Sequence, residues 1–213
     1  RKGIDWYGCS GLDFARFYEN ETNIKEMILP IVGYGHSVLK KEAQEITKDY
    51  PELPKLIEDM FQTMYAANGV GLAAPQVNLS IRLVVIDADP FKEMYPDAEG
   101  FKKVFINPTI LEYKGEMWND FEEGCLSLPE IHEEVSRPRE VVVKYYDENF
   151  EEHIEEFNGI RARVFQHEYD HLQGKVFVDR LSALRKTLLK RKLNDIATNK
   201  VRTSYRMKPN PKK

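Results

Sequence analysis

Apolar and polar positions alternate along the chain with the periods of a few helices and several strands. Between residues 53 and 67, apolar side chains recur every three or four positions, which predicts a helix. Pro54 suits its first turn, and Asn68-Gly69 suits its end. Short apolar runs predict strands at residues 81–87, 104–107, 141–146 and 153–157. The last two flank turn-forming residues and predict a hairpin.

A second helix is predicted where Ile160, Val164, His167 and His171 recur at spacings of four, three and four. These residues share one face, which is apolar in its first turns and carries imidazoles in its last. A third helix, over residues 182–196, is also amphipathic, with Leu184, Leu188 and Ile196 near one face.

Runs of strands broken by only a few helices are typical of an α+β fold and not of an alternating α/β chain. The 213 residues, 42% of them hydrophobic, are enough for one domain with extensions. We predict that this domain covers residues 27–196. We interpret residues 1–26 as an added or mis-assigned extension, with a native N-terminal arm as the alternative. Residues 197–213 are predicted to be a basic, disordered tail.

Charge is distributed unevenly along the chain. The formal net charge is −4, yet residues 185–213 contain eleven Lys or Arg and one acidic residue, Asp195. A basic tail on an acidic body indicates an anionic partner, although a solvated tail would look the same. The two cysteines, Cys9 and Cys125, are too few for a disulfide framework and favour a cytoplasmic setting. We see no membrane-spanning run and no signal peptide.

The candidate chemistry centres on His167, Glu168 and His171 of the second predicted helix. Two histidines four residues apart can bind one metal ion, and the glutamate between them can reach a water without binding the ion. Ordinary helices also contain such pairs. No second motif downstream supplies a third ligand, because Phe177 stands where one class of zinc protease has a histidine and no Glu follows Glu168. We therefore look upstream to Cys125, which as a thiolate would complete the ligand set. A buried, inert cysteine is the alternative.

Three motifs occur in order: G-x-G-x-A-A-x-Q at residues 69–76, E-G-C-x-S at 123–127, and H-E-x-x-H at 167–171. With these motifs the chain, from about residue 27 to residue 181, resembles the peptide deformylases, which remove the formyl group from the N-terminus of nascent bacterial and organellar proteins. The resemblance implies an α+β fold with antiparallel sheets around a central helix bearing the two histidines. The third predicted helix would be an additional C-terminal one.

The resemblance also implies one divalent ion, natively Fe²⁺, with Zn²⁺, Ni²⁺ or Co²⁺ able to take its place. The ligands would be Cys125, His167 and His171. Glu168 would take a proton from the attacking water and deliver it to the leaving amine. Two hydrogen-bond donors would stabilise the oxyanion, namely the Gln76 side chain and the Leu126 backbone N–H. Glu123 would either orient a ligand or lie in solvent.

The expected substrates are N-formylmethionyl peptides. The resemblance and helix geometry place the pocket for the methionine side chain at Val70, Gly71, Ile160 and Val164, all of which could equally be ordinary core residues. Members of the family often have an arginine a few residues past the cysteine motif, where this chain has Ile131-His132. The basic tail would bind the ribosome near the tunnel exit. Two rival functions stay open: a zinc endopeptidase, and an inactive relative that only binds nascent chains or the ribosome.

Overall fold

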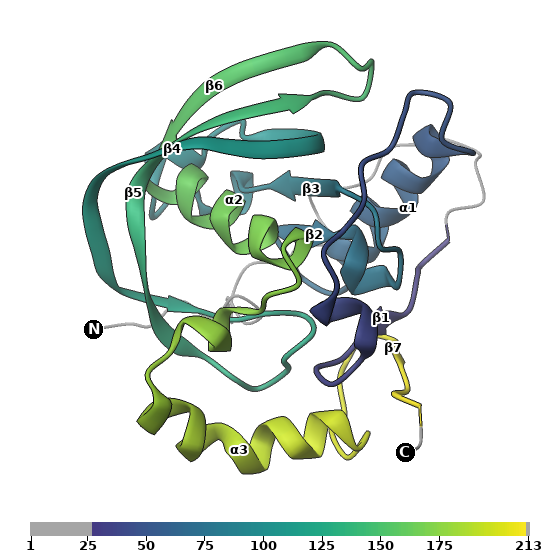
Figure 1. Ribbon diagram of the computed structural model, residues 1–213, viewed down its shortest axis with the longest axis vertical. Coiled ribbons are helices and arrows are strands. Elements are labelled where there is room, and N and C mark those ends of the chain that lie inside the picture. Colours follow the sequence, from purple (N-terminus) through teal and green to yellow (C-terminus); the bar gives the residue numbers. More distant parts are fainter. Residues whose placement is uncertain (1–26, 212–213) are drawn as a thin grey trace.

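The computed structural model describes residues 27–211 (Figure 1). The predicted extension at residues 1–26 lies outside the described residues. The main layer is a five-stranded sheet in the order β2-β3-β4-β5-β6, in which every pairing is antiparallel. Its strands are β2 (Gly71–Ala73), β3 (Leu83–Asp87), β4 (Lys102–Glu123), β5 (Glu133–Tyr146) and β6 (Glu152–Asn158).

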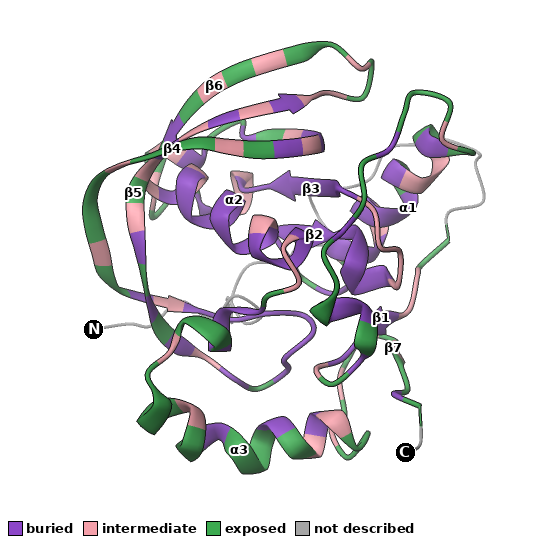
Figure 2. Cartoon of the chain, viewed as in Figure 1, coloured by how far each residue is buried: buried purple, intermediate pink, exposed green. Residues whose placement is uncertain are grey.

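Between residues 27 and 211, three α-helices accompany the sheet: α1 (Leu53–Ala66), α2 (Gly159–Leu172) and α3 (Ala183–Ala197). Figure 1 shows α2 enclosed by the strands, whereas α3 lies apart from the sheet near the C-terminus. In Figure 2, α2 is buried along most of its length and α3 is largely exposed. The predicted α+β fold, with a central helix carrying H-E-x-x-H and a C-terminal helix, is therefore confirmed. None of the helices between residues 27 and 211 has the length and apolar character that a membrane span requires.

The side chains of β3 alternate between two hydrophobic clusters. Val84 and Ile86 pack in the cluster that includes Phe165 of α2, while Leu83 and Val85 pack in the cluster that includes Met60 of α1. Successive side chains of a strand point to opposite faces, so a strand covered on both sides is apolar over most of its length, as Leu83–Ile86 is here. The sheet thus lies between α1 and α2, and the buried α2 brings its polar residues into the interior.

Two strands are much longer than predicted, although the predicted hairpin is present as β5 and β6. β4 has 22 residues and β5 has 14. Residues 109–120 of β4 are exposed or half-buried. The pairing of β4 with β5 is interrupted by register shifts. Exposed, irregular strand segments have no continuous apolar run or regular alternation, so the hydrophobic pattern does not mark them.

Two predictions about the C-terminal region need correction, and the first concerns the apolar face of α3, which was right for Ile196 only. α3 buries Leu189, Leu193 and Ile196, whereas Leu184 and Leu188 are exposed. The buried residues pack in one cluster with residues of the loop after Cys125, so packing against that loop decides which face is buried.

The predicted disordered tail is ordered up to residue 211. Its short strand β7 (Met207–Lys208) pairs in parallel with β1 (Ile31–Val32). Asn210 is buried and its side-chain amide donates to the Tyr34 carbonyl oxygen at 2.8 Å. Backbone pairing and a buried amide hold this segment although it has few apolar residues. Lys212 and Lys213 lie outside the described residues.

Candidate metal centre

The start of α2 is held by a side chain that lies far away in the sequence. Gly159 has a φ of +54°, a conformation that suits glycine, and the Ile160 N–H donates to Asp97 Oδ2 at 2.8 Å. A carboxylate at a helix N-terminus satisfies an otherwise unpaired donor. This contact helps to fix the position of α2, and with it the direction in which His167 and His171 project.

The three predicted ligands lie together. One ligand atom from each of Cys125, His167 and His171 lies within 4.8 Å of the other two, and all three residues are buried. Cys125 Sγ lies 3.3 Å from His171 Nε2. His171 Nδ1 has no hydrogen-bond partner among residues 27–211. One thiol and two imidazoles converging in this way are suited to a divalent transition metal and leave room for a further ligand.

Glu123 lies behind this cluster and is completely buried. Its Oε2 is 2.9 Å from His167 Nδ1, which leaves Nε2 of that ring for the cluster. The guanidinium of Arg137 donates to both carboxylate oxygens, at 2.6 and 2.8 Å, and Arg163 donates to Oε1 at 2.9 Å. Although burial would raise the pKa of Glu123, Arg137 and His167 hold this pKa well below its usual range. Glu123 was predicted either to orient a ligand or to lie in solvent. The structure buries it against the predicted ligand His167.

Arg137, Asp170 and Arg180 form a charged chain that sequence reasoning missed. Arg137 Nη1 donates to Asp170 Oδ2 at 2.8 Å, and Arg180 donates to both Asp170 oxygens at 2.6 Å. Burial would raise the pKa of Asp170, but the two guanidinium groups lower it below its ordinary value. The sequence offers only a weak signal for this network: Asp170 is one of the polar residues on a helix that is buried nearly all round.

The two histidines differ in their proton affinity. Burial lowers the pKa of His167, but hydrogen bonds with Cys125 and Glu123 outweigh it and raise this pKa to about 10. Burial and the neighbouring charge of His167 lower the pKa of His171 to about 3. His171 is therefore neutral near pH 7, as a metal ligand must be, whereas an ion has to displace a proton from His167.

Glu168 lies against the glycine-rich motif. A Cβ atom at Gly71 would come within 2.4 Å of Glu168 Oε1, so a glycine is needed for this close approach. Burial raises the pKa of the Glu168 carboxyl to about 7. Its Oε2 has no hydrogen-bond partner among the residues that the structure describes. A buried carboxyl with a pKa near neutrality can take up and release a proton at physiological pH.

Gln76 lies at the cluster, and Leu126 is the residue after Cys125. Gln76 Oε1 accepts from the Ala73 N–H at 2.8 Å, which directs the amide nitrogen towards Cys125 Sγ at 3.6 Å and Ser127 Oγ at 3.4 Å. Leu126 directly follows Cys125 and is buried. The structure thus places the Gln76 amide beside a predicted ligand, whereas the role of both donors stays a prediction.

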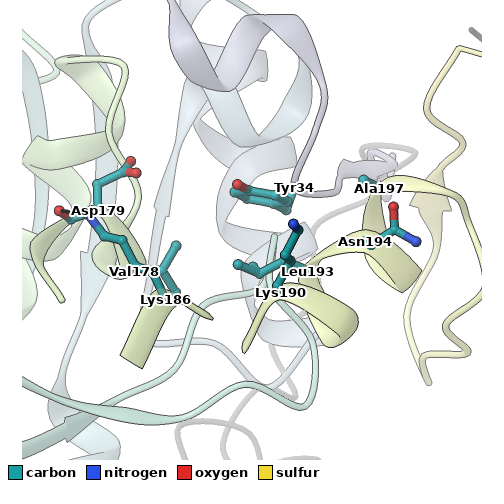
Figure 3. A pocket seen from close by; sticks show the side chains of 8 residues that line it. All are labelled: Tyr34, Val178, Asp179, Lys186, Lys190, Leu193, Asn194 and Ala197. Atoms are coloured by element: carbon teal, nitrogen blue, oxygen red, sulfur yellow. Dashed lines mark hydrogen bonds between the residues drawn. The ribbon is translucent and has the colours of Figure 1, made fainter. Parts of the chain in front are cut away.

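The four residues predicted to receive the methionine side chain are all buried, and three of them, Val70, Ile160 and Val164, share one core cluster. Their role stays a prediction, as does the effect of His132 on substrate affinity. A separate pocket of about 350 Å³ opens between Tyr34 and α3 (Figure 3). Neither the predicted ligands nor the predicted methionine-pocket residues line it.

Comparisons with known proteins agree with this geometry. The model of the polypeptide deformylase family matches residues 28–187. The peptide deformylase of Flavobacterium psychrophilum is 53% identical over 194 residues, which cover 88% of this chain and 100% of the relative. That of Christiangramia forsetii is 52% identical over 195 residues and covers 88% of this chain and 99% of the relative.

Solved structures of the same family are also similar. The peptide deformylase of Legionella pneumophila superposes with a TM-score of 0.70 at 40% identity, covering 79% of this chain and 95% of that one. A Met-Ala-Ser-bound peptide deformylase from Acinetobacter baumannii gives a TM-score of 0.68 at 40% identity, covering 73% of this chain and 99% of that one. The family model, these relatives and the clustered Cys-His-His site lead to one conclusion: the chain belongs to the peptide deformylase family.

Proposed function

We propose that Cys125, His167 and His171 hold the single divalent ion with which this hydrolase removes the formyl group from formylmethionyl nascent peptides. The convergence of one thiol and two imidazoles beside a buried glutamate carries this proposal. The Met-Ala-Ser peptide bound by the Acinetobacter relative supports a substrate that begins with methionine. We place the reaction in the cytoplasm, because a chain with two cysteines suits a reducing setting.

The native ion in our proposal is Fe²⁺, and Zn²⁺, Ni²⁺ or Co²⁺ can replace it. When bound, the ion supplies Lewis acidity that makes water a better nucleophile near neutral pH. A thiolate is a strong, soft donor that partly neutralises a divalent ion. We expect the iron-loaded protein to lose activity in air and the nickel-loaded protein to keep it. Parallel activity assays with and without oxygen test this assignment.

The side chains of the protein move the proton and stabilise the charge. Glu168 takes the proton of the attacking water and then gives it to the leaving amine as formate departs. The Gln76 amide and the Leu126 N–H donate to the formyl oxygen, on which negative charge develops. The loss of one such donor raises the barrier by about 2.7–4 kcal/mol. Gln76→Ala should therefore lower kcat by about 10²- to 10³-fold, and an unchanged kcat would remove Gln76 from this role.

We propose that the methionine side chain enters beside Val70, Gly71, Ile160 and Val164. The support is that α2 brings Ile160 and Val164 into one cluster with Val70. Replacing Val164 with Leu should raise KM for formyl-Met-Ala-Ser more than it lowers kcat. The same replacement at Val143, a core residue of β5, is the control. Equal effects of the two substitutions would exclude a specific role for Val164.

The family comparison does not favour the rival zinc endopeptidase or the inactive binding protein. A direct test compares hydrolysis of formyl-Met-Ala-Ser with cleavage of casein by the same metal-loaded preparation. We expect formate release and no casein fragments. Cleavage of casein without formate release would support the endopeptidase instead.

We further propose that the basic C-terminal region binds the ribosome near the tunnel exit. Exposed Lys and Arg side chains of α3 and the following residues would bind ribosomal RNA through counterion release. Replacement of Lys190, Arg191 and Lys200 by Gln should weaken salt-sensitive cosedimentation with ribosomes. The control replaces three exposed lysines elsewhere, Lys41, Lys48 and Lys175. Equal cosedimentation of both variants would contradict this proposal.

A further inference from the structure

The loop at residues 125–128 carries a proposed metal ligand and the proposed donor N–H of Leu126. Its first three carbonyl oxygens each accept a hydrogen bond. Cys125 O accepts from the Leu128 N–H at 2.8 Å, within the loop. The carbonyl oxygens of Leu126 and Ser127 accept from residues outside the loop. The orientation of the peptide groups after Leu126 and after Ser127 therefore depends on distant parts of the chain.

The outside donors come from opposite ends of the described chain. The Tyr205 hydroxyl donates to Leu126 O at 2.7 Å across a separation of 79 residues. The Tyr34 N–H donates to Ser127 O at 2.8 Å. Tyr205 lies beyond residue 187, where the family match ends. The C-terminal region thus contributes this hydroxyl to the loop at residues 125–128.

These two ends form one structural unit. β1 and β7 pair in parallel, and the Ile31 N–H donates to Arg206 O at 2.9 Å. The Asn210 side chain donates to Tyr34 O, so the same residue that holds Ser127 is itself held by the C-terminal region. Figure 1 shows β1 and β7 side by side near the C-terminus. The chain directly after Tyr205 is therefore held by β1 and by the Tyr34 carbonyl oxygen.

The surroundings of Tyr205 favour a hydroxyl that stays in place and donates to the Leu126 carbonyl oxygen. Its ring packs against the hydrophobic cluster that contains Leu126. Burial and the neighbouring charge of Cys125 raise the pKa of the Tyr205 hydroxyl above its ordinary value. The hydroxyl stays protonated at physiological pH and donates to the carbonyl, which has no proton to give.

We propose that Tyr205 is a positioning residue for deformylation, whose hydroxyl holds the peptide group after Leu126 and thereby orients the Leu126 N–H and Cys125 Sγ. The inference rests on the proposed function, because it assumes the roles of Cys125 and Leu126 given there. Tyr205 acts through the loop and not on the substrate. Its loss should therefore lower the rate of the chemical step more than the affinity for substrate.

The test is Tyr205→Phe, which removes only the hydroxyl. The matched control is Tyr146→Phe in the β5–β6 hairpin, where the hydroxyl donates to Glu152 Oε2 at 3.1 Å. Both variants are made with Cys9→Ser so that Cys125 is the only thiol. Kinetics use formyl-Met-Ala-Ser and nickel-loaded enzyme. A second readout is the rate at which iodoacetamide alkylates Cys125 in the metal-free protein.

We expect Tyr205→Phe to lower kcat roughly 3- to 10-fold with KM changed less than about twofold, as the loss of one hydrogen bond implies. Alkylation of Cys125 should be faster by a similar factor, and Tyr146→Phe should match the parent in both assays. Equal kcat and equal alkylation in the two variants would overturn the inference, even if both melt at a lower temperature. An inactive parent enzyme would refute the proposed function instead, and the alkylation rates would still decide whether Tyr205 orders the loop.

Discussion

The Cys125 loop lies between two segments of different character: the C-terminal part of α2 and the segment after α3. The α2 segment contributes two imidazoles and a carboxylate to the site, and its charges are buried among Glu123, Arg137 and Arg163. The segment after α3 is mostly exposed and contributes one hydroxyl and a two-residue strand. We infer that α2 supplies the chemistry and the C-terminal segment supplies alignment. Substitutions in the two segments should therefore differ by orders of magnitude in their effects.

The largest effect is expected at Glu168. Glu168→Gln keeps the shape of the side chain but cannot take up a proton, so kcat should fall by about 10²- to 10⁴-fold. Metal content should stay at the wild-type level, because Glu168 is not a ligand in our proposal. Glu156→Gln, at an exposed position on β6, is the control. Turnover close to wild type in Glu168→Gln would place the proton transfer on another group.

The next effect concerns stability. Glu123→Gln removes the anionic partner of the buried Arg163 and one of the two anionic partners of the buried Arg137, which keeps Asp170. Breaking a buried ion pair in this way typically costs about 3–5 kcal/mol of unfolding free energy. Denaturant titration of the metal-free protein measures this loss, with the exposed Glu134→Gln as control. A loss of less than about 1 kcal/mol would show that the network contributes no more than surface pairs do.

A third effect is the pH dependence of metal binding. The pKa of His167 is about 10, so this ring is protonated near neutral pH in the metal-free protein. Metal binding must displace that proton. The contribution of His167 should therefore raise the metal affinity about tenfold per pH unit between pH 6 and 8. Chelator competition with Zn²⁺ at several pH values measures it. A constant affinity over this range would contradict the protonated state of His167 in the metal-free protein.

The smallest effect is expected in the C-terminal segment. Asn210→Ala removes the hydrogen bonds from the side-chain amide to the carbonyl oxygens of Tyr34 and Ala197. Unfolding free energy should fall by about 1–2 kcal/mol, with kcat lowered only a few-fold. Asn149→Ala in the β5–β6 turn is exposed and serves as control. A loss of activity as large as that of Glu168→Gln would contradict the division of roles between the two segments.

The site residues of α2 could be predicted from the sequence because they are close together along the chain. His167, Glu168 and His171 lie within one helical turn of each other, so their spacing alone predicts that they share a site. Cys125 was found by residue type together with the order of the three motifs. The apolar spacing of α1 and the apolar run of β3 likewise predicted those elements within a few residues.

Other features depend on contacts that leave no local pattern. Tyr205 binds a backbone carbonyl 79 residues away, and any residue type can provide a carbonyl. Arg137 is one of many arginines in the sequence, and only the fold shows that it is completely buried beside Glu123 and Asp170. The basic composition after α3 predicted disorder, but backbone pairing with β1 and the buried Asn210 order this segment.

The central claim is that one thiolate and two imidazoles bind a single catalytic ion. X-ray absorption at the metal edge, combined with metal analysis, tests it most directly on zinc-loaded protein carrying Cys9→Ser. The account predicts one ion per chain with one sulfur and two imidazole nitrogens as ligands, and loss of the sulfur ligand in Cys125→Ser. A spectrum without sulfur, or one that Cys125→Ser leaves unchanged, would contradict it.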